Sequence, residues 1–262
     1  MTWTTRPRFD LGDGLSGIVA GSGALVLLIH GVGLRAEAWA PQIDALSRYF
    51  RVIAADLPGH GKSRLGAEAA LEDYTARLAR ALNHPAVVIG HSMGAMIALD
   101  LARTVPGRVR GVAALNAIFR RGPEAKTAVQ ARAEYLSGAV RPDPEPTLRR
   151  WFGAADTEAR RICRTWLEGV DAAGYRAAYG VFAREDGPSD ATLRGLRCPA
   201  LFMTGGQEPN STPAMSEAMA ALAPRGRVEV VSDAAHMMPM THSAGVSERL
   251  LRFVKECQND DD

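Results

Sequence analysis

The stretch "AVVIGHSMGAMIAL", residues 86–99, runs from a short apolar segment through a glycine-flanked serine into a second apolar segment. Its first five residues are typical of a buried strand, and the spacing after Ser92 is typical of a helix. Gly90 and Gly94 lack side chains, so the strand and the helix can approach each other closely around the serine. We predict that Ser92 is a nucleophile held on a sharp turn. The alternative is an ordinary strand-to-helix junction, and the other groups that a serine nucleophile needs decide between the two.

Apolar runs of strand length recur on both sides of this stretch. They lie at residues 24–30, 51–56, 108–116, 198–205 and 227–231. Segments with helical spacing of apolar residues separate the strands in the first third of the chain, for example 37–50 and 71–83. This alternation predicts an α/β fold with a mostly parallel central sheet and helices on both faces. In such a sheet, ligands bind beyond the carboxyl ends of the strands.

The middle of the chain interrupts this alternation. Residues 118–195 contain helical stretches separated by "RPDPEP", "AGY" and "REDGPSD", and they lack a convincing buried strand. The strand-and-helix series then resumes at about residue 198. We therefore predict a core domain formed by residues 1–117 and 196–262, with residues 118–195 inserted between two of its strands as a helical cap.

Composition and charge limit the classes of function. The 262 residues are 47% hydrophobic and carry a formal net charge of +2, which is typical of a globular protein that binds neither nucleic acid nor an anionic membrane surface. The first residues lack a signal-peptide pattern, and the run at 24–29 is too short to span a bilayer. Cys163, Cys198 and Cys257 are too few and too widely spaced for a disulfide framework or a metal cluster. We expect reduced structural thiols, no metal or cofactor, and a cytoplasmic protein.

A general base for Ser92 is expected after the last strand. Of the six histidines, His236 in "SDAAHMMPM" directly follows the run at 227–231 and lies downstream of the serine, as the order serine, acid, histidine requires. A histidine there would remove the serine proton and return it to the leaving group. His242 is the rival, but it lies at the start of the final helix, where we expect a solvated or capping residue.

The acid of the site is predicted three residues beyond Gly205, where Glu208 follows the run at 198–205. A buried carboxylate at this point would hold the tautomer of the histidine and stabilise the imidazolium. The alternative is an exposed loop glutamate. Asp233 lies on the wrong side of the chain reversal, and Asn116 at the end of the run at 108–116 offers an amide rather than an acid.

Acyl transfer also needs two N–H groups that bind the developing oxyanion, each worth about 3 kcal/mol. One is predicted to be the N–H of Met93, the residue after the nucleophile. The other is expected in the loop "HGVG" at 30–33, most simply from Val32. Shaping a tight loop is the other use of this glycine-rich segment, and the two uses are compatible.

Together, these features resemble the α/β-hydrolase family. The resemblance rests on Ser92, Glu208 and His236 in that order, with "HGVG", the elbow "GHSMGA" and "DLPGHGKS" at 56–63. It implies that residues 118–195 are the family's helical cap and that Asp56 and His60 orient loops rather than react. Within the family, the chain is most similar to small hydrolases such as 3-oxoadipate enol-lactonase. It departs from them at the acid, because these relatives usually carry aspartate where Glu208 stands.

The expected activity is that of a cofactor-free serine hydrolase acting on a small carboxylic ester or lactone. A serine rather than an aspartate nucleophile disfavours the family's dehalogenases and epoxide hydrolases. A carbon–carbon bond hydrolase, a perhydrolase and a non-catalytic ligand receptor remain alternatives, and oligomeric state is left open.

Two sets of side chains have open roles. Arg120 and Arg121 either bind a substrate carboxylate or belong to a solvated surface. Four methionines either line the pocket or fill gaps in the core. They are Met93, Met237, Met238 and Met240.

Overall fold

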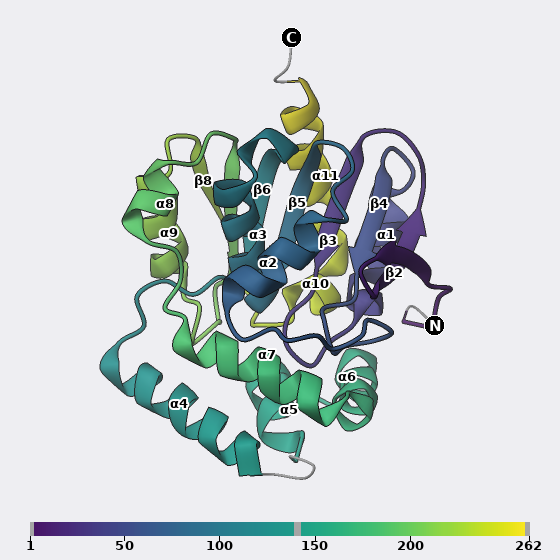
Figure 1. Ribbon diagram of the computed structural model, residues 1–262. Coiled ribbons are helices and arrows are strands. Elements are labelled where there is room, and N and C mark those ends of the chain that lie inside the picture. The colour runs from purple at the N-terminus through teal and green to yellow at the C-terminus, as the bar shows by residue number, and fades with distance from the viewer. Residues whose placement is uncertain (1–2, 139–142, 260–262) are drawn as a thin grey trace.

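In the computed structural model, residues 3–138 and 143–259 are described, and they form one eight-stranded sheet (Figure 1). The strand order is β1-β2-β4-β3-β5-β6-β7-β8. The strands are β1 (Phe9–Gly12), β2 (Leu15–Ala20), β3 (Leu25–Ile29), β4 (Arg51–Ala55), β5 (Ala86–His91), β6 (Val109–Leu115), β7 (Ala200–Gly205) and β8 (Gly226–Val231). The pairs β1/β2 and β2/β4 are antiparallel, and every other neighbouring pair is parallel. The predicted α/β fold with a mostly parallel sheet is confirmed.

The N-terminal pair β1 and β2 is the part of the sheet that the apolar pattern did not predict. β1 is short and largely exposed at one edge, so its residues do not form an apolar run. At the opposite edge, Val228 and Val230 of β8 are 38% exposed. The central strands are buried on both faces; in β3, for example, all five residues are buried. A parallel strand buried on both faces appears in the sequence as a continuous apolar run, so these strands could be predicted.

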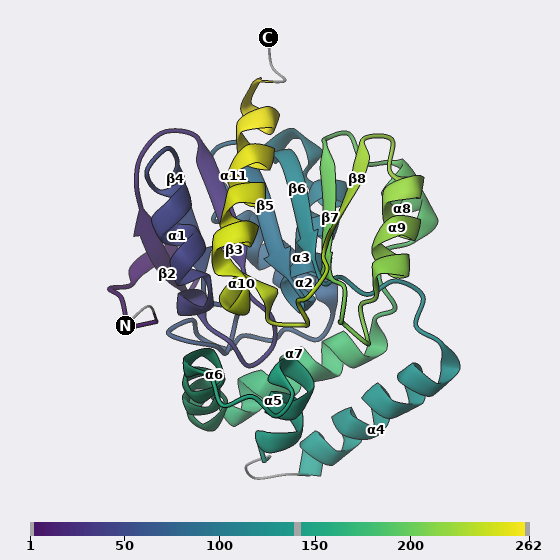
Figure 2. The ribbon, with the colours of Figure 1, turned by 180° about the vertical axis from the view of Figure 1, so that it is seen from behind.

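Helices cover both faces of the sheet (Figures 1 and 2). On one face, α2 (Leu71–Ala79), α3 (Met93–Thr104) and α9 (Pro213–Leu222) contribute to one hydrophobic core. On the other face, α1 (Ala40–Leu46) and α11 (Ser243–Asn259) contribute to a second. The remaining short elements of the core are η1 (Ala36–Trp39), η2 (Pro106–Arg108), α8 (Asp190–Arg194) and α10 (Met238–Thr241).

Five helices of the described residues lie between β6 and β7 in the sequence, and the first four are called here the helical insertion. They are α4 (Pro123–Gly138), α5 (Glu145–Phe152), α6 (Glu158–Gly169) and α7 (Ala172–Arg184). They lie together beyond the carboxyl ends of the parallel strands, whereas α8 packs beside α9 (Figure 1). One hydrophobic cluster joins the insertion to the core: Trp151, Cys163 and Trp166 of the insertion pack with Leu34 and Met240 of the core. This cluster holds the insertion over the carboxyl ends of the parallel strands.

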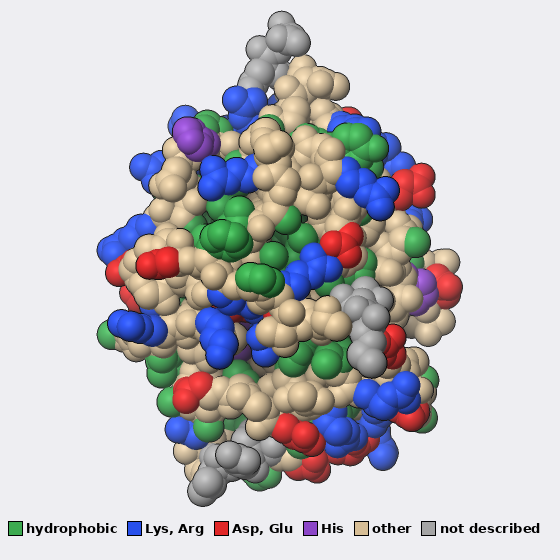
Figure 3. All heavy atoms as spheres, turned by 90° about the vertical axis from the view of Figure 1, so that its right-hand side faces the viewer, with side chains coloured by type: hydrophobic (Ala, Val, Ile, Leu, Met, Phe, Trp, Pro, Cys, Tyr) green, Lys and Arg blue, Asp and Glu red, His purple; other side chains and the backbone are tan. Residues whose placement is uncertain are grey.

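Basic and acidic side chains lie interspersed on the face shown in Figure 3, as a net charge of +2 leads one to expect. Within residues 3–138 and 143–259, no helix has both the length and the apolarity needed to cross a membrane.

Candidate active site

Ser92 lies between β5 and α3 with φ 57° and ψ −120°, a backbone conformation that side chains disfavour. A Cβ on Gly90 would lie 2.0 Å from the carbonyl oxygen of Gly94, and one on Gly94 would lie 2.2 Å from that of Ile29. Both positions therefore require glycine. The N–H of Ser92 donates to the carbonyl of Leu115 at 2.9 Å, which fixes the turn against the neighbouring strand.

His236 and Glu208 meet at this end of the sheet. The Nδ1 atom of His236 lies 2.7 Å from Oε2 of Glu208, whose side chain is fully buried. Oε1 of the same carboxylate accepts the N–H groups of Asn210 at 2.8 Å and Ser211 at 3.4 Å. Glu208 is thus a buried partner of His236 rather than an exposed loop residue.

The charge state of Glu208 follows from its surroundings. Burial alone would raise the pKa of this carboxyl, but His236 and the N–H groups of Asn210 and Ser211 outweigh burial and lower the pKa to about 2. The carboxylate is therefore ionised at neutral pH and can only accept hydrogen bonds. Nδ1 of His236 must then carry a proton, which leaves Nε2 of the neutral ring as the basic nitrogen.

The other histidine and aspartate near this loop have a separate arrangement. His242 pairs with Asp233 at 3.3 Å, at the start of the final helix, as expected of a solvated or capping histidine.

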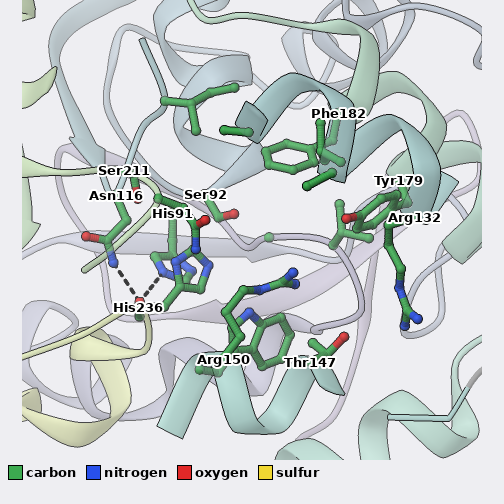
Figure 4. A pocket seen from close by; sticks show the side chains of 18 of the residues that line it. His91, Ser92, Asn116, Arg132, Thr147, Arg150, Tyr179, Phe182, Ser211 and His236 are labelled. Carbon is green, nitrogen blue, oxygen red and sulfur yellow. Dashed lines mark hydrogen bonds between the residues drawn. The ribbon is translucent and has the colours of Figure 1, made fainter. Parts of the chain in front are cut away.

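Ser92 and His236 line one cavity of about 240 Å³ between the carboxyl ends of the strands and the helical insertion (Figure 4). Its aromatic lining comes from the insertion, namely from Trp151 of α5 and from Tyr175, Tyr179 and Phe182 of α7. A cavity of this size and lining suits a small, partly apolar molecule.

Of the two predicted oxyanion donors, Val32 lines this cavity. Met93 is not among the lining residues, but it directly follows Ser92 as the first residue of α3. In the described part of the chain, neither N–H group donates a hydrogen bond. Gly33, beside Val32, donates its N–H to Nε2 of His60 at 3.0 Å, which fixes the loop that presents the Val32 N–H.

Sequence and structure comparisons place the chain among known proteins. The profile of the Alpha/beta hydrolase family matches residues 26–249. The chain belongs to the alpha/beta hydrolase family. The predicted family and fold are thereby confirmed, and relatives named as hydrolases and esterases support a hydrolase.

Three relatives illustrate the similarity. The (E)-2-((N-methylformamido)methylene)succinate hydrolase of Acinetobacter baylyi is 38% identical over 242 residues, which cover 90% of this chain and 92% of that protein. The pimeloyl-(acyl-carrier protein) methyl ester esterase of Xanthomonas axonopodis is 32% identical, over 90% of this chain and 97% of its own. Among solved structures, a malate-bound esterase of Thermogutta terrifontis superposes with TM-score 0.84, 28% identity and 93% coverage of both chains.

A lactonase is also similar in structure. The enol-lactonase of Burkholderia xenovorans superposes on this hydrolase with TM-score 0.83, covering 95% of this chain and 100% of that one. Its sequence identity is 24%, so this likeness concerns the fold.

The sequence analysis did not predict the roles of two residues near the site of this hydrolase, Asn116 and His91. The side-chain amide of Asn116 donates to the backbone carbonyl of His236 at 2.6 Å, and Nε2 of His91 contacts the same oxygen at 2.8 Å (Figure 4). Oδ1 of Asn116 accepts from the hydroxyl of Thr204 at 3.0 Å and the N–H of Gly205 at 3.2 Å. Asn116 therefore ties the ends of β6 and β7 to the His236 loop. Its place at a strand end was the available signal.

The charge of His91 is also set by burial. Burial lowers the pKa of His91 to about 3, and the nearby His236 adds to this effect. The neutral ring therefore donates from Nε2 to the His236 carbonyl and is not available as a second base.

The loops around the oxyanion donors are held by Asp56 and two neutral histidines. Asp56 accepts from Arg8 at 2.7 Å and from the N–H of Ala36 at 2.8 Å. Burial lowers the pKa of His30 to about 3 and lowers that of His60, so their Nε2 atoms accept hydrogen bonds. These contacts orient loops, which is the role that the family resemblance implies for Asp56 and His60.

The structure shows which of the two arginines and four methionines with open roles line the cavity. Arg120 pairs with Asp190 at 2.5 Å away from the cavity, whereas Arg121 lines it. None of the four methionines lines the cavity; all are buried in core clusters. Within the described residues, no three His, Cys, Asp or Glu side chains are grouped in a way that could hold a metal ion.

Proposed function

We propose that this protein is a serine hydrolase that cleaves a small carboxylic ester or lactone through an acyl-enzyme on Ser92. The observation that carries the proposal is that His236, paired with the buried Glu208, lines the same cavity as Ser92 on its strained turn. An ordinary strand-to-helix junction requires neither the backbone strain nor the adjacent paired histidine.

In the first half of the reaction, Oγ of Ser92 attacks the substrate carbonyl carbon, and Nε2 of His236 takes the hydroxyl proton. The imidazolium that forms is stabilised by the ionised Glu208 at 2.7 Å. The N–H groups of Val32 and Met93 bind the oxyanion of the tetrahedral intermediate. The intermediate collapses when the bond to the leaving oxygen breaks and His236 gives that oxygen its proton.

In the second half, water attacks the acyl carbon and His236 takes a proton from it. The second tetrahedral intermediate expels Oγ of Ser92, which recovers the proton from His236. The products are a carboxylic acid and an alcohol, or one hydroxy acid when the substrate is a lactone. The chain's own residues perform each step.

The relatives support hydrolysis of carbonyl compounds, because one is named for an acyl-carrier-protein methyl ester and another for a substituted succinate. In the proposal, residues 118–195 act as a cap that closes the cavity over the substrate, with α5 and α7 as its inner wall. The proposed compartment is the cytoplasm, in keeping with three buried free cysteines.

A fluorophosphonate probe tests the nucleophile directly. The wild-type protein should be labelled at one serine per chain, and Ser92→Ala should abolish labelling. Ser211→Ala is the matched control, because Ser211 lines the same cavity but does not lie on the strained turn. Absence of labelling in the folded wild-type protein, or labelling that survives in Ser92→Ala, would exclude the proposed function.

A further inference from the structure

The cavity beside Ser92 carries a positive charge that its own lining does not balance. Three arginines line it, Arg121, Arg132 and Arg150, and its described lining residues include no aspartate or glutamate. Ser92 and His236 add no negative charge to the lining of the cavity, and the ionised Glu208 is buried behind His236. An apolar, aromatic cavity with excess positive charge favours an anionic ligand.

The guanidinium groups of Arg121 and Arg132 already interact with other groups of the protein. Arg121 donates to the carbonyls of Glu185 and Phe182, and its guanidinium lies over the Phe182 ring at 4.4 Å. Arg132 lies over the Tyr135 ring at 5.2 Å, on the far side of the cavity from Ser92 (Figure 4).

Arg132 also borders a second hollow on the insertion. That hollow is lined by the acidic residues Asp143, Glu168 and Asp171, which offset the charge of Arg132.

Arg150 differs from both. Among residues 3–138 and 143–259, it forms no ion pair or hydrogen bond through its side chain. The acid of its own helix, Glu145, is occupied by Arg160 and Arg164. Figure 4 shows the Arg150 side chain rising from α5 toward the middle of the cavity that Ser92, His236 and Tyr179 surround.

The helix that carries Arg150 is held against the reacting centre. Trp151, the next residue, stacks on the His236 ring with centroids 5.9 Å apart, and Thr147 one turn earlier also lines the cavity. Arg150 is thus presented at a defined place relative to His236.

We propose that the natural substrate carries a carboxylate remote from the scissile carbonyl, and that Arg150 binds it. This inference rests on the proposed function, because it names the substrate class of the same site. A guanidinium binds a carboxylate through two parallel hydrogen bonds, which orients the substrate as well as attracting it. One unpaired guanidinium balances one negative charge, so a single carboxylate fits better than a phosphate dianion.

Matched esters test the proposal. Monomethyl esters of the dicarboxylic acids from succinate to adipate are compared with methyl keto esters of the same length, such as methyl levulinate, in which a neutral acetyl group replaces the carboxylate. The wild-type enzyme should favour the best anionic ester in kcat/KM by about 10-fold or more, the ratio expected of a charge-assisted hydrogen bond. High salt should reduce this preference, because Arg150 is exposed.

Arg150→Met should bring the ratio close to one by slowing only the anionic esters. Arg149→Met is the matched control: Arg149 occupies the same exposed turn of α5 but does not line the cavity, so its removal should leave the ratio unchanged. A wild-type ratio near one, or a ratio that survives Arg150→Met, overturns the proposal.

A second measurement does not depend on turnover. Succinate should slow fluorophosphonate labelling of Ser92, neutral succinamide should not, and Arg150→Met should lose the difference. If labelling proceeds but succinate and succinamide act alike, the carboxylate site is wrong while the serine hydrolase stands. If Ser92 is not labelled at all, the proposed function itself fails.

Discussion

The indole ring of Trp151 lies stacked on the imidazole of His236, with 5.9 Å between centroids and 19° between planes. The helical insertion therefore contacts the proposed base directly. Because an aromatic pair contributes about 0.5–1.5 kcal/mol, Trp151→Ala should lower kcat/KM roughly 2-fold to 10-fold, while Trp151→Phe should retain most of it.

Loss of stability must be separated from this effect. Trp166→Ala is the control, because Trp166 belongs to the same hydrophobic cluster as Trp151 but does not stack on His236. Both alanine variants should unfold at lower urea concentration, and only Trp151→Ala should lose activity per folded molecule. Equal activity of the two variants would contradict a role for the stack.

Asn116 is expected to position His236 through its backbone. In Asn116→Asp, a carboxylate oxygen replaces the amide donor 2.6 Å from the His236 carbonyl, while the acceptor to Thr204 is kept. We expect a loss of about 1–3 kcal/mol in the free energy of unfolding and a fall in kcat of about 10-fold with little change in KM. Asn83→Asp, at an exposed position, controls for the added charge. A change confined to stability, with kcat intact, would leave Asn116 a structural residue only.

Glu208→Gln keeps the shape of the side chain and removes its charge. Turnover of an activated ester should fall by about 10³-fold to 10⁴-fold, because the ring loses its tautomer and the imidazolium loses its counter-charge. Glu217→Gln, on the exposed side of α9, is the control for loss of one carboxylate. Turnover near the wild-type rate would place the acid elsewhere.

The same carboxyl predicts a pH dependence of stability. Its pKa falls from 4.5 to about 2 on folding, so its contribution is fully present above pH 4.5 and is lost as the pH falls toward 2. By linkage the contribution amounts to about 3 kcal/mol. The difference in unfolding free energy between wild type and Glu208→Gln, measured in urea, should shrink over this interval. A difference independent of pH would show that Glu208 is not ionised by its folded surroundings.

The strained turn at Ser92 makes a further prediction. Glycine adopts φ 57° without the clash that a Cβ causes, so Ser92→Gly should be more stable than Ser92→Ala by about 1 kcal/mol. Both variants lack the hydroxyl and should be inactive. Urea denaturation of the two variants compares them directly, and an alanine variant as stable as the glycine variant would argue against strain at this turn.

Much of the fold could be predicted from local patterns. The central strands are buried on both faces, so each is a continuous apolar run, and the runs alternate along the chain with segments of helical spacing. The edge strand β1 was missed because an exposed strand has no such run. The neighbouring β2 was missed because Ser16 and Gly17 interrupt its apolar residues. Ser92, Glu208 and His236 were predicted because their order along the chain and their positions after strand-like runs can be read directly from the sequence. The structure brings the last two into contact, and their catalytic roles stay predictions.

The amino-acid sequence by itself determined the central strand segments, the turn at Ser92 and the candidates for acid and base, because these depend on short-range periodicity and spacing. Only the tertiary structure decided that Asn116 holds the His236 carbonyl, that Trp151 stacks on its ring and that Arg150 faces the cavity. Asn116 lies 120 residues from His236 in the chain. Such contacts arise from how the helical insertion and the strand ends pack together, and packing over that separation leaves no periodic trace in the sequence.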